Sequence, residues 1–525
     1  RSPGLRPTPA PIPVGPTSIA AILDPAVAGA PDEEALVDGL RRYTYRQIDH
    51  AVDAAAALLT QAGAAPGTRI ACSAPNGCNI VIAFLAVQRI GAIWVGVNGV
   101  LPAAEKARLL RHAGAAIFLG DAGACAGIEE ARAELPDLGR VLVMDSDGRW
   151  LDAGRGGAPF TRARVDPHAI AAINYTSGTT GEPKGVLHSQ HGLLAPVASI
   201  TAHGLAGAPL RRGVILPLSI TNVMVVGPML AFLNRTACVI GPGTRPADVL
   251  PWIDRERIEV FSSVPAIIHD LIHADRAPTS LKALLSGGAP LPLPVAARFA
   301  RRFGFAITNT YGLTEAPTIV AESRGRADAP EGASGIALPH IRITIRDDAG
   351  DELPPGETGE ICVQPVEEGA WRGVYARLLG YWRDAARTDA ANAVPWLNTG
   401  DMGRLDADGW LYVTDRKSDM ILRGGSNIYP QEIARVLEAD RRVAACAIVG
   451  VPDDRLGERT AAFIQPAEGI AGDQALFDDL AGACRNALAT YKCPDFWHAL
   501  PVLPRNPGGK VVLAELRRIA AASKR

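Results

Sequence analysis

Short apolar segments alternate with helical segments through the first 310 residues, and this alternation is the feature that most limits how the chain can fold. Strands are expected at 69–73, 92–97, 213–218, 236–240, 260–264, 283–286 and 306–310, and helices at 42–59, 79–90 and 102–112. Strands that are separated by helices usually pair in parallel, with the helices packed on the faces of the sheet. The sequence therefore predicts an α/β protein whose large N-terminal domain contains helix-covered, mainly parallel sheets.

The pattern changes near residue 335, where short alternating strands with Asp and Gly turns begin. Examples are the segments 341–346 and 359–363. Such alternation is typical of antiparallel strands with one buried face. A small β-barrel-like subdomain is therefore expected at about 335–416, at the end of an N-terminal domain that spans 1–416.

Residues 417–525 have strands and helices of their own, and they predict a small α+β C-terminal domain. The expected strands are 445–451 and 460–465, and the expected helices are 430–437 and 476–488. At the other end of the chain, residues 1–16 are rich in Pro and Gly, which is typical of a flexible lead-in.

Composition excludes several classes of function. The net charge of −2 over 525 residues gives no electrostatic reason to bind nucleic acid or an anionic membrane. The apolar runs are far shorter than the roughly 20 residues that span a bilayer, and no signal peptide follows Arg1. The eight cysteines are scattered without a Cys-x-x-Cys pair, which favours reduced thiols in the cytoplasm over a disulfide framework or a zinc site.

The segment 175–186 reads Tyr-Thr-Ser-Gly-Thr-Thr-Gly-Glu-Pro-Lys-Gly-Val and follows an apolar stretch, 169–173, that is expected to be a buried strand. Glycines let backbone N–H groups turn inward, hydroxyls add hydrogen-bond donors, and the lysine adds a positive charge. A lone run of this composition is more often a flexible surface turn. The order Ser-Gly-Thr-Thr-Gly-x-Pro-Lys-Gly is specific, however, and it does not fit a Walker A loop. We therefore interpret 175–186 as an anion-binding loop and call it the phosphate loop.

Two later segments combine small and polar residues directly after an expected strand. They are 286–290, which reads Ser-Gly-Gly-Ala-Pro, and 309–315, which reads Asn-Thr-Tyr-Gly-Leu-Thr-Glu. Residues that follow parallel strands gather at the carboxyl edge of the sheet, where open α/β sheets bind their ligands. The two segments are therefore expected to share one binding site.

Together with the phosphate loop, these motifs resemble the adenylate-forming enzymes, which include acyl-CoA synthetases, firefly luciferase and the adenylation domains of peptide synthetases. The chain is most like an AMP-forming acyl-CoA synthetase, and the resemblance covers about residues 20–515. It implies that ATP and AMP contact the three loops at Thr176, Ser177, Gly178, Thr179, Thr180, Gly181, Gly288, Ala289, Pro290, Asn309, Thr310, Tyr311 and Gly312.

The resemblance also assigns chemistry to individual side chains of these loops. It implies that Tyr311 lies against the purine, Thr314 binds the α-phosphate, Glu315 binds Mg²⁺, and Lys184 acts in catalysis. A flat ring suits a flat base, and Mg²⁺ takes a hard oxygen ligand while it keeps most of its waters. Taken alone, a tyrosine at a strand end is more often a core residue and a glutamate is more often solvated.

Two further residues resemble the family's ribose site. Asp401 ends the segment Leu-Asn-Thr-Gly-Asp at 397–401, and Arg416 ends the segment at 409–416. An isolated Asp after Gly is usually a turn residue. The resemblance implies instead that Asp401 accepts hydrogen bonds from both ribose hydroxyls, with help from Arg416, because a carboxylate can accept from two vicinal donors.

The same comparison implies a mobile C-terminal domain. Lys417 and Ser418 correspond to the hinge, although the family usually has Asp or Lys at the position of Ser418. The turn at Gly424 and Gly425 is expected to contact the pantetheine arm of CoA. Near the end of the chain, Lys510 follows Gly-Gly and matches the family's catalytic lysine, whereas a lysine in such a place is ordinarily a solvated surface charge.

The acyl pocket is the region in which the chain resembles the family least. The residues expected to line it are Ser219, Ile220, Thr221, Met224 and Gly288. Many acyl-CoA synthetases have an aromatic–histidine pair where this chain has Ser219 and Ile220. The candidate pocket is neutral and largely aliphatic, and the identity of the acid does not follow from it.

These observations predict a ligase that joins a carboxylic acid to CoA in two steps. The acid and MgATP first give acyl-AMP and pyrophosphate, and CoA then displaces AMP. The alternatives are an enzyme that loads the phosphopantetheine of a carrier protein and, from another class, a nucleotide sensor without catalysis, which would have no use for Lys510. Oligomeric state stays open, and a homodimer is one of the alternatives.

Overall fold

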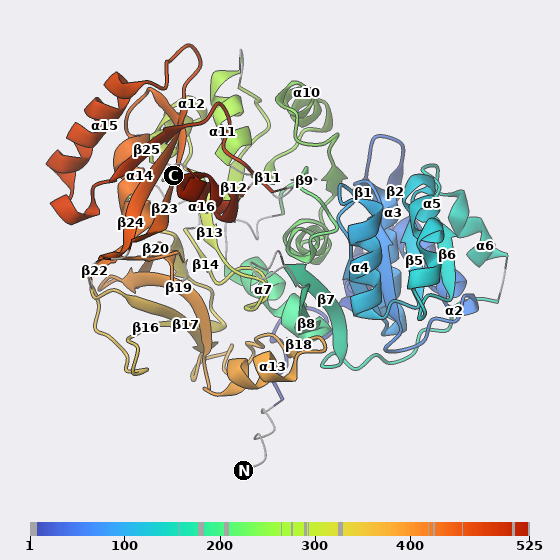
Figure 1. Ribbon diagram of the computed structural model, residues 1–525. Coiled ribbons are helices and arrows are strands. Elements are labelled where there is room, and N and C mark those ends of the chain that lie inside the picture. Colours follow the sequence, from blue (N-terminus) through green and yellow to red (C-terminus); the bar gives the residue numbers. More distant parts are fainter. Residues whose placement is uncertain are drawn as a thin grey trace.

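The computed structural model describes residues 8–156, 158–176, 183–203, 209–263, 265–274, 277–287, 291, 293–323, 329–417, 419–423, 426–453, 455–506 and 510–522. It consists of a large N-terminal part with two sheets and a smaller C-terminal part with a third sheet (Figure 1). The predicted α/β class is confirmed.

The first sheet has seven strands and carries the phosphate loop. In spatial order they are β18 (Gly380–Tyr381), β8 (Lys184–Ser189), β7 (Ile170–Thr176), β4 (Ile93–Gly96), β3 (Arg69–Ser73), β5 (Ile117–Gly120) and β6 (Arg140–Val143). The strands from β7 to β6 pair in parallel, as predicted, whereas β8 and β18 are antiparallel to their neighbours.

The second sheet has thirteen strands. In spatial order they are β16 (Ile341–Arg346), β17 (Gly359–Pro365), β19 (Leu397–Leu405), β20 (Trp410–Arg416), β15 (Gly335–Ala337), β14 (Ala321–Glu322), β13 (Thr308–Tyr311), β12 (Ala283–Gly287), β11 (Val260–Ser263), β9 (Arg212–Val214), β10 (Cys238–Ile240), β1 (Glu34–Val37) and β2 (Arg42–Thr44). The strands from β13 to β1 pair in parallel. The remaining pairs are antiparallel.

The antiparallel strands expected at 335–416 are present, but hydrogen bonds connect β15, β20, β19, β17 and β16 to the edge of the thirteen-stranded sheet. They do not form a separate sheet. The connection runs through β14, a strand of two residues that is too short to show a periodic pattern in the sequence.

Helices separate and cover the two large sheets. The layer between them contains α2 (Tyr45–Gln61), α3 (Cys78–Ile90) and α7 (Gln190–His203), whose apolar residues share one core with both sheets. All thirteen residues of α3 are buried, and ten of them are apolar, which is typical of a helix that lies inside the core. The outer face of the seven-stranded sheet packs on α4 (Ala103–Ala113) and α5 (Ala122–Glu130). The outer face of the thirteen-stranded sheet packs on α10 (Pro246–Glu256), α11 (Pro265–His273) and α12 (Leu293–Phe303).

Shorter helices complete the large part. They are η1 (Ile19–Ala21), α1 (Asp24–Gly29), η2 (Arg132–Glu134), η3 (Arg149–Leu151), α6 (Asp152–Arg155), α8 (Thr221–Met224), η5 (Val225–Met229), α9 (Leu230–Leu233) and α13 (Ala385–Asn392). In the described part of the chain, no helix is both long enough and apolar enough to cross a membrane.

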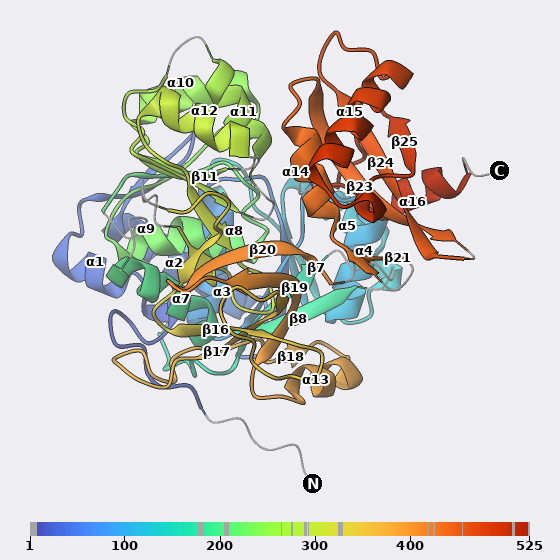
Figure 2. The ribbon, with the colours of Figure 1, turned by 90° about the vertical axis from the view of Figure 1, so that its left-hand side faces the viewer.

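The C-terminal part is a sheet with helices on both faces. Its elements are β21 (Ile421–Arg423), β22 (Ser426–Ile428), α14 (Pro430–Glu438), β23 (Val443–Asp453), β24 (Gly457–Pro466), α15 (Gln474–Ala487), η6 (Thr490–Lys492), β25 (Phe496–Ala499) and α16 (Leu513–Ala522). Helices α14 and α15 cover one face of the sheet and α16 covers the other. In Figure 2 this part and the group α10–α12 form two separate lobes above β19 and β20.

Candidate active site

Strands β12 and β13 bring two of the predicted nucleotide loops together. They are parallel neighbours, with Gly287 opposite Thr310, so the segments that follow them leave the same edge of the sheet. The turn after β13 requires a glycine at position 312, because a Cβ atom there would lie 1.8 Å from the carbonyl oxygen of Thr318. Asn309 and Thr310 lie in β13 itself, and the Thr310 hydroxyl donates to the Ser286 carbonyl at 3.1 Å.

The turn after β13 places Glu315 against the phosphate-loop lysine. The Lys184 Nζ atom lies 2.5 Å from the Glu315 Oε1 atom, although 131 residues separate the two positions. Tyr381 of β18 completes the cluster, because its hydroxyl lies 3.4 Å from the same carboxylate oxygen and its ring centre lies 4.8 Å from the Lys184 ammonium. The sequence analysis missed Tyr381, whose only signal was an aromatic residue after Gly380 in a strand of two residues.

This cluster favours the ionised form of Glu315. Burial raises the pKa of its carboxyl group, but the hydrogen bond and the positive charge of Lys184 outweigh burial, so that the net pKa is lowered. Among the described residues, no group of three or more His, Cys, Asp or Glu side chains is arranged to hold a metal ion. A single ionised carboxylate next to a phosphate-binding segment still suits Mg²⁺, which takes one or two carboxylates together with phosphate oxygens and water.

The backbone carbonyls of Thr314 and Glu315 are also held in place. The Nε2 atom of His188 lies 2.6 Å from the Thr314 carbonyl oxygen, and the backbone N–H of Leu378 donates to the Glu315 carbonyl at 2.9 Å. His188 lies in β8 and is 1% exposed, and burial lowers the pKa of its imidazole to about 4. The sequence analysis missed His188 as well, because a histidine in an apolar strand is more often a core residue.

Asp401 connects the two residues predicted to bind adenine and ribose. Its Oδ2 atom accepts a hydrogen bond from the Tyr311 hydroxyl at 2.7 Å, and its Oδ1 atom lies 3.1 Å from the Arg416 Nε atom. Asp401 lies within β19 and is 5% exposed, so it is a strand residue and not the turn residue that a Gly-Asp pair usually indicates. Burial raises the pKa of Asp401, while Arg416 opposes that shift.

Lys510 of the C-terminal part lies near enough to this pair for the charges to interact. The side chain is exposed, yet the surrounding protein removes enough of its water to lower the pKa of the ammonium; the nearby Arg416 charge lowers it further, and Asp401 opposes. Two hydrogen bonds join Asn506 and Lys510: the Asn506 N–H donates to the Lys510 carbonyl, and the Lys510 N–H donates to the Asn506 side chain. Lys510 is therefore within electrostatic reach of Asp401 and Arg416, although it belongs to the smaller part.

The predicted acyl segment lies between the two large sheets. The carbonyl oxygen of Ser219 approaches β4 so closely that a Cβ atom at Gly96 would lie 2.1 Å from it. The Thr221 hydroxyl donates to Asn174 of β7, and Met224 is fully buried in the core between the sheets. Ile220 differs from these neighbours, because it is 39% exposed.

The hinge and several loop residues complete the predicted set. Lys417 directly follows β20 and contacts two carboxylates, with its Nζ atom 2.8 Å from Asp348 and 3.2 Å from Glu360. Thr176 ends β7 opposite Lys184. The remaining predicted positions lie outside the described residues: Ser177, Gly178, Thr179, Thr180, Gly181, Gly288, Ala289, Pro290, Ser418, Gly424 and Gly425.

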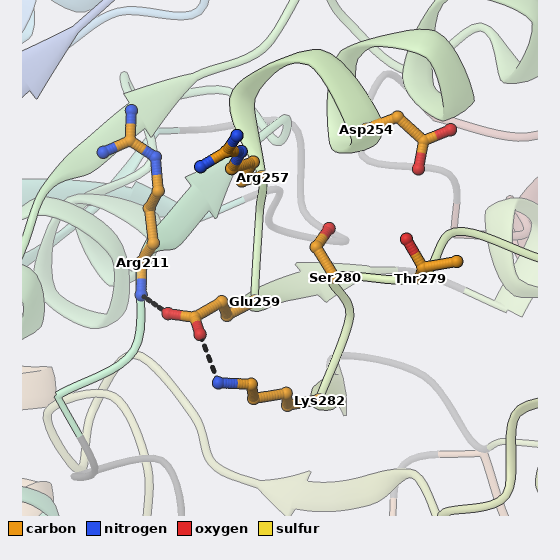
Figure 3. A pocket seen from close by; sticks show the side chains of 7 residues that line it. All are labelled: Arg211, Asp254, Arg257, Glu259, Thr279, Ser280 and Lys282. Atoms are coloured by element: carbon orange, nitrogen blue, oxygen red, sulfur yellow. Dashed lines mark hydrogen bonds and ion pairs between the residues drawn. The ribbon is translucent and has the colours of Figure 1, made fainter.

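A hollow of about 630 Å³ lies elsewhere, at the amino ends of β9, β11 and β12 (Figure 3). Several of its lining charges are paired, since Lys282 contacts Glu259 and the Arg211 guanidinium contacts Glu34. Because the predicted nucleotide loops follow the opposite ends of the strands, this hollow is not part of the candidate active site.

Comparison with known proteins agrees with this geometry. A family model described as AMP-binding enzyme matches residues 23–367, and one described as AMP-binding enzyme C-terminal domain matches residues 432–510. The chain belongs to the AMP-binding enzyme family.

Relatives of this AMP-binding enzyme match over nearly the whole chain. The 3-[(3aS,4S,7aS)-7a-methyl-1,5-dioxo-octahydro-1H-inden-4-yl]propanoyl:CoA ligase of Mycobacterium tuberculosis (strain ATCC 25618 / H37Rv) is 35% identical, over 96% of this chain and 99% of the relative. The feruloyl-CoA synthase of an Amycolatopsis species is 29% identical, over 93% and 96%. The crystal structure of the anthranilate CoA ligase AuaEII in complex with anthranoyl-AMP matches with a TM-score of 0.87 at 25% identity, over 97% of this chain and 98% of that one. The predicted class, an AMP-forming acid–thiol ligase, is confirmed.

Proposed function

We propose that this AMP-binding enzyme activates a monocarboxylic acid with a compact apolar body, as its adenylate, and then transfers the acyl group to CoA. The observation that carries the proposal is the arrangement of Lys184, Glu315, Asp401 and Lys510 around the carboxyl edge of the parallel strands. A nucleotide sensor would need the first three of these residues but not Lys510.

The assigned roles follow from charge and position. Tyr311 and Arg416 both contact the carboxylate of Asp401 and orient it. This carboxylate can accept hydrogen bonds from the two ribose hydroxyls. Lys510 supplies positive charge where negative charge gathers on the α-phosphate during attack by the carboxylate, and such preorganised charge is usually the largest catalytic contribution. No covalent enzyme intermediate is needed, so catalysis consists of positioning and electrostatics.

Glu315 and Thr314 would hold Mg²⁺ and the phosphates beside Lys184. The bound Mg²⁺ would neutralise the charge of the phosphate oxygens and help pyrophosphate to leave. The pairing of Glu315 with Lys184 supports this assignment, because it keeps the carboxylate ionised and oriented. We also propose that the enzyme acts in the cytoplasm, supported by eight cysteines that are all free thiols, six of them buried.

The proposal predicts that exchange of pyrophosphate into ATP requires both Mg²⁺ and an added carboxylic acid. The measurement is the exchange rate with each component omitted in turn, followed by thioester formation with free CoA or with a phosphopantetheinylated carrier protein. Exchange that ignores every acid would contradict the proposed function. A thioester that forms only on the carrier protein would favour the alternative acceptor over CoA.

The acyl segment supports the choice of acid. Ile220 is 39% exposed beside Ser219 and Thr221, so its apolar side chain is available for contact with an acid. The predicted acyl segment contains no basic residue that could pair with a second carboxylate. Burying the second carboxylate of a diacid without a partner is costly. The relatives named above act on a bicyclic propanoate, on ferulate and on anthranilate, which are compact cyclic acids.

We therefore expect cyclohexanecarboxylate, benzoate or a medium-chain fatty acid to exceed malonate in kcat/KM by at least about 100-fold. Ile220→Ala should lower kcat/KM for the apolar acids by about 10-fold, because one buried aliphatic contact is lost. Val100→Ala is the matched control, since Val100 is an exposed aliphatic side chain, 69% accessible, outside this segment. Malonate outperforming every apolar acid would refute the proposed substrate class.

A further inference from the structure

Strands β8 and β18 present three polar side chains on one face toward the turn after β13. Lys184 and His188 share this face because they are four residues apart in β8, and successive strand residues alternate between faces. Tyr381 pairs with Val186, which lies midway between them on the same face. All three side chains contact either Thr314 or Glu315.

The contact made by His188 differs from the other two, because it reaches the backbone. A carbonyl oxygen only accepts, so the Nε2 atom of His188 donates to the Thr314 carbonyl, at 2.6 Å. In a trans peptide the C=O and the following N–H point in opposite directions, and no cis peptide bond occurs among the described residues. The Glu315 N–H therefore points away from His188.

The backbone of Glu315 is consequently held on both sides of its Cα atom. The carbonyl before Glu315, that of Thr314, is fixed to the sheet by His188, and the Glu315 carboxylate lies 2.5 Å from the Lys184 Nζ atom. The carbonyl of Glu315 is fixed in turn by the Leu378 N–H. Rotation of the Thr314–Glu315 peptide would break the His188 bond and move the carboxylate away from Lys184.

We infer that His188 is a positioning residue for adenylation, which sets the orientation of Glu315 toward Lys184 through the Thr314 carbonyl. This inference rests on the proposed function, in which Glu315 and Thr314 hold Mg²⁺ and the phosphates. His188 touches neither nucleotide nor acid in this role. Its effect is to keep two site residues in the geometry that the bound phosphates require.

The test compares His188→Leu, which removes the donor, with His188→Gln, whose side-chain amide can reach the place of Nε2. His191→Leu is the matched control, because His191 is equally buried and its Nε2 donates to another backbone carbonyl, that of Val374, at 2.8 Å. The readouts are pyrophosphate exchange against Mg²⁺ concentration, the rise in unfolding temperature caused by MgATP, and thioester formation from supplied acyl-AMP and CoA.

For His188→Leu we expect exchange to fall by about 10- to 100-fold, with a higher Mg²⁺ requirement and a smaller MgATP-induced rise in unfolding temperature. Thioester formation should persist. His188→Gln should recover most of the exchange, and His191→Leu should lower stability while keeping the Mg²⁺ dependence. Unchanged Mg²⁺ dependence in His188→Leu, or equal loss in both leucine variants after correction for the folded fraction, would overturn the inference.

If His188→Leu does not fold, His188→Gln is compared with His188→Asn, whose amide is too short to reach the carbonyl. Equal exchange by these two variants would overturn the role of His188, and impaired exchange in Asn alone would support it. A wild-type enzyme without acid-dependent exchange would overturn the proposed function instead. The MgATP thermal shift would still decide the role of His188 in that case.

Discussion

Lys510→Ala should reduce acyl-adenylate formation by about 100- to 1,000-fold while the enzyme still converts supplied acyl-AMP and CoA to the thioester. Lys510 lies close to Arg416 and Asp401 in the present arrangement of the two parts, where its charge can act on the α-phosphate. The turn at Gly424 and Gly425, which is predicted to bind CoA in the second step, belongs to the same smaller part. One fixed arrangement would not serve both steps, so rotation near Lys417 and Ser418 is expected between them.

Assaying the two half-reactions separately tests this expectation. Lys282→Ala serves as the control, because Lys282 also pairs with a carboxylate, that of Glu259, but lies at the opposite edge of the sheet. It should leave both half-reactions unchanged. Equal loss of both half-reactions in a folded Lys510→Ala variant would show a single fixed site without domain alternation.

Asp401→Ala should raise the KM for ATP by about 10- to 100-fold and also lower stability. The carboxylate is 5% exposed and accepts from the Tyr311 hydroxyl at 2.7 Å, so its removal leaves a buried donor without an acceptor. An unsatisfied buried group costs about 1–3 kcal/mol, and hydrogen bonds to a charged group, as proposed for the ribose hydroxyls, contribute about 1.5–3 kcal/mol. Stability is measured by denaturant unfolding and affinity by steady-state exchange kinetics.

Asp406→Ala separates the two effects. Asp406 accepts from the Tyr412 hydroxyl at 3.1 Å and from the Trp410 N–H at 2.9 Å, so it repeats the aspartate–tyrosine bond in a turn away from the site. The control should lose stability without a change in the KM for ATP. If the KM rises equally in both variants, Asp401 supports the fold and does not bind the ribose.

The sequence by itself determined the class of fold and the order of the site motifs. The apolar stretches fixed most strands, for example β3 at Arg69–Ser73, because a strand buried on both faces is a short continuous apolar run. The two loops after β12 and β13 were predicted to share a sheet edge, and these strands are parallel neighbours. Local patterns of this kind need no knowledge of distant residues.

Tertiary structure decided which side chains meet. Glu315 pairs with Lys184 across 131 positions, and His188 bonds to Thr314 across 126 positions. Tyr381 joins that cluster from a strand of two residues, which has no period to detect. These contacts depend on how the antiparallel strands β8 and β18 pack against the turn after β13, which belongs to the other large sheet. No local sequence pattern encodes that packing.

Asp401 shows the same division between local pattern and packing. Its neighbours Thr-Gly identified it as a candidate, but the local pattern also favoured an ordinary turn. Only the pairing of β19 with β20 places Asp401 directly opposite Arg416, and only the packing of β13 brings the Tyr311 hydroxyl to its other oxygen. The sequence therefore determined which residues could form the site, and burial and strand pairing decided how they are oriented, because those depend on segments that are remote along the chain.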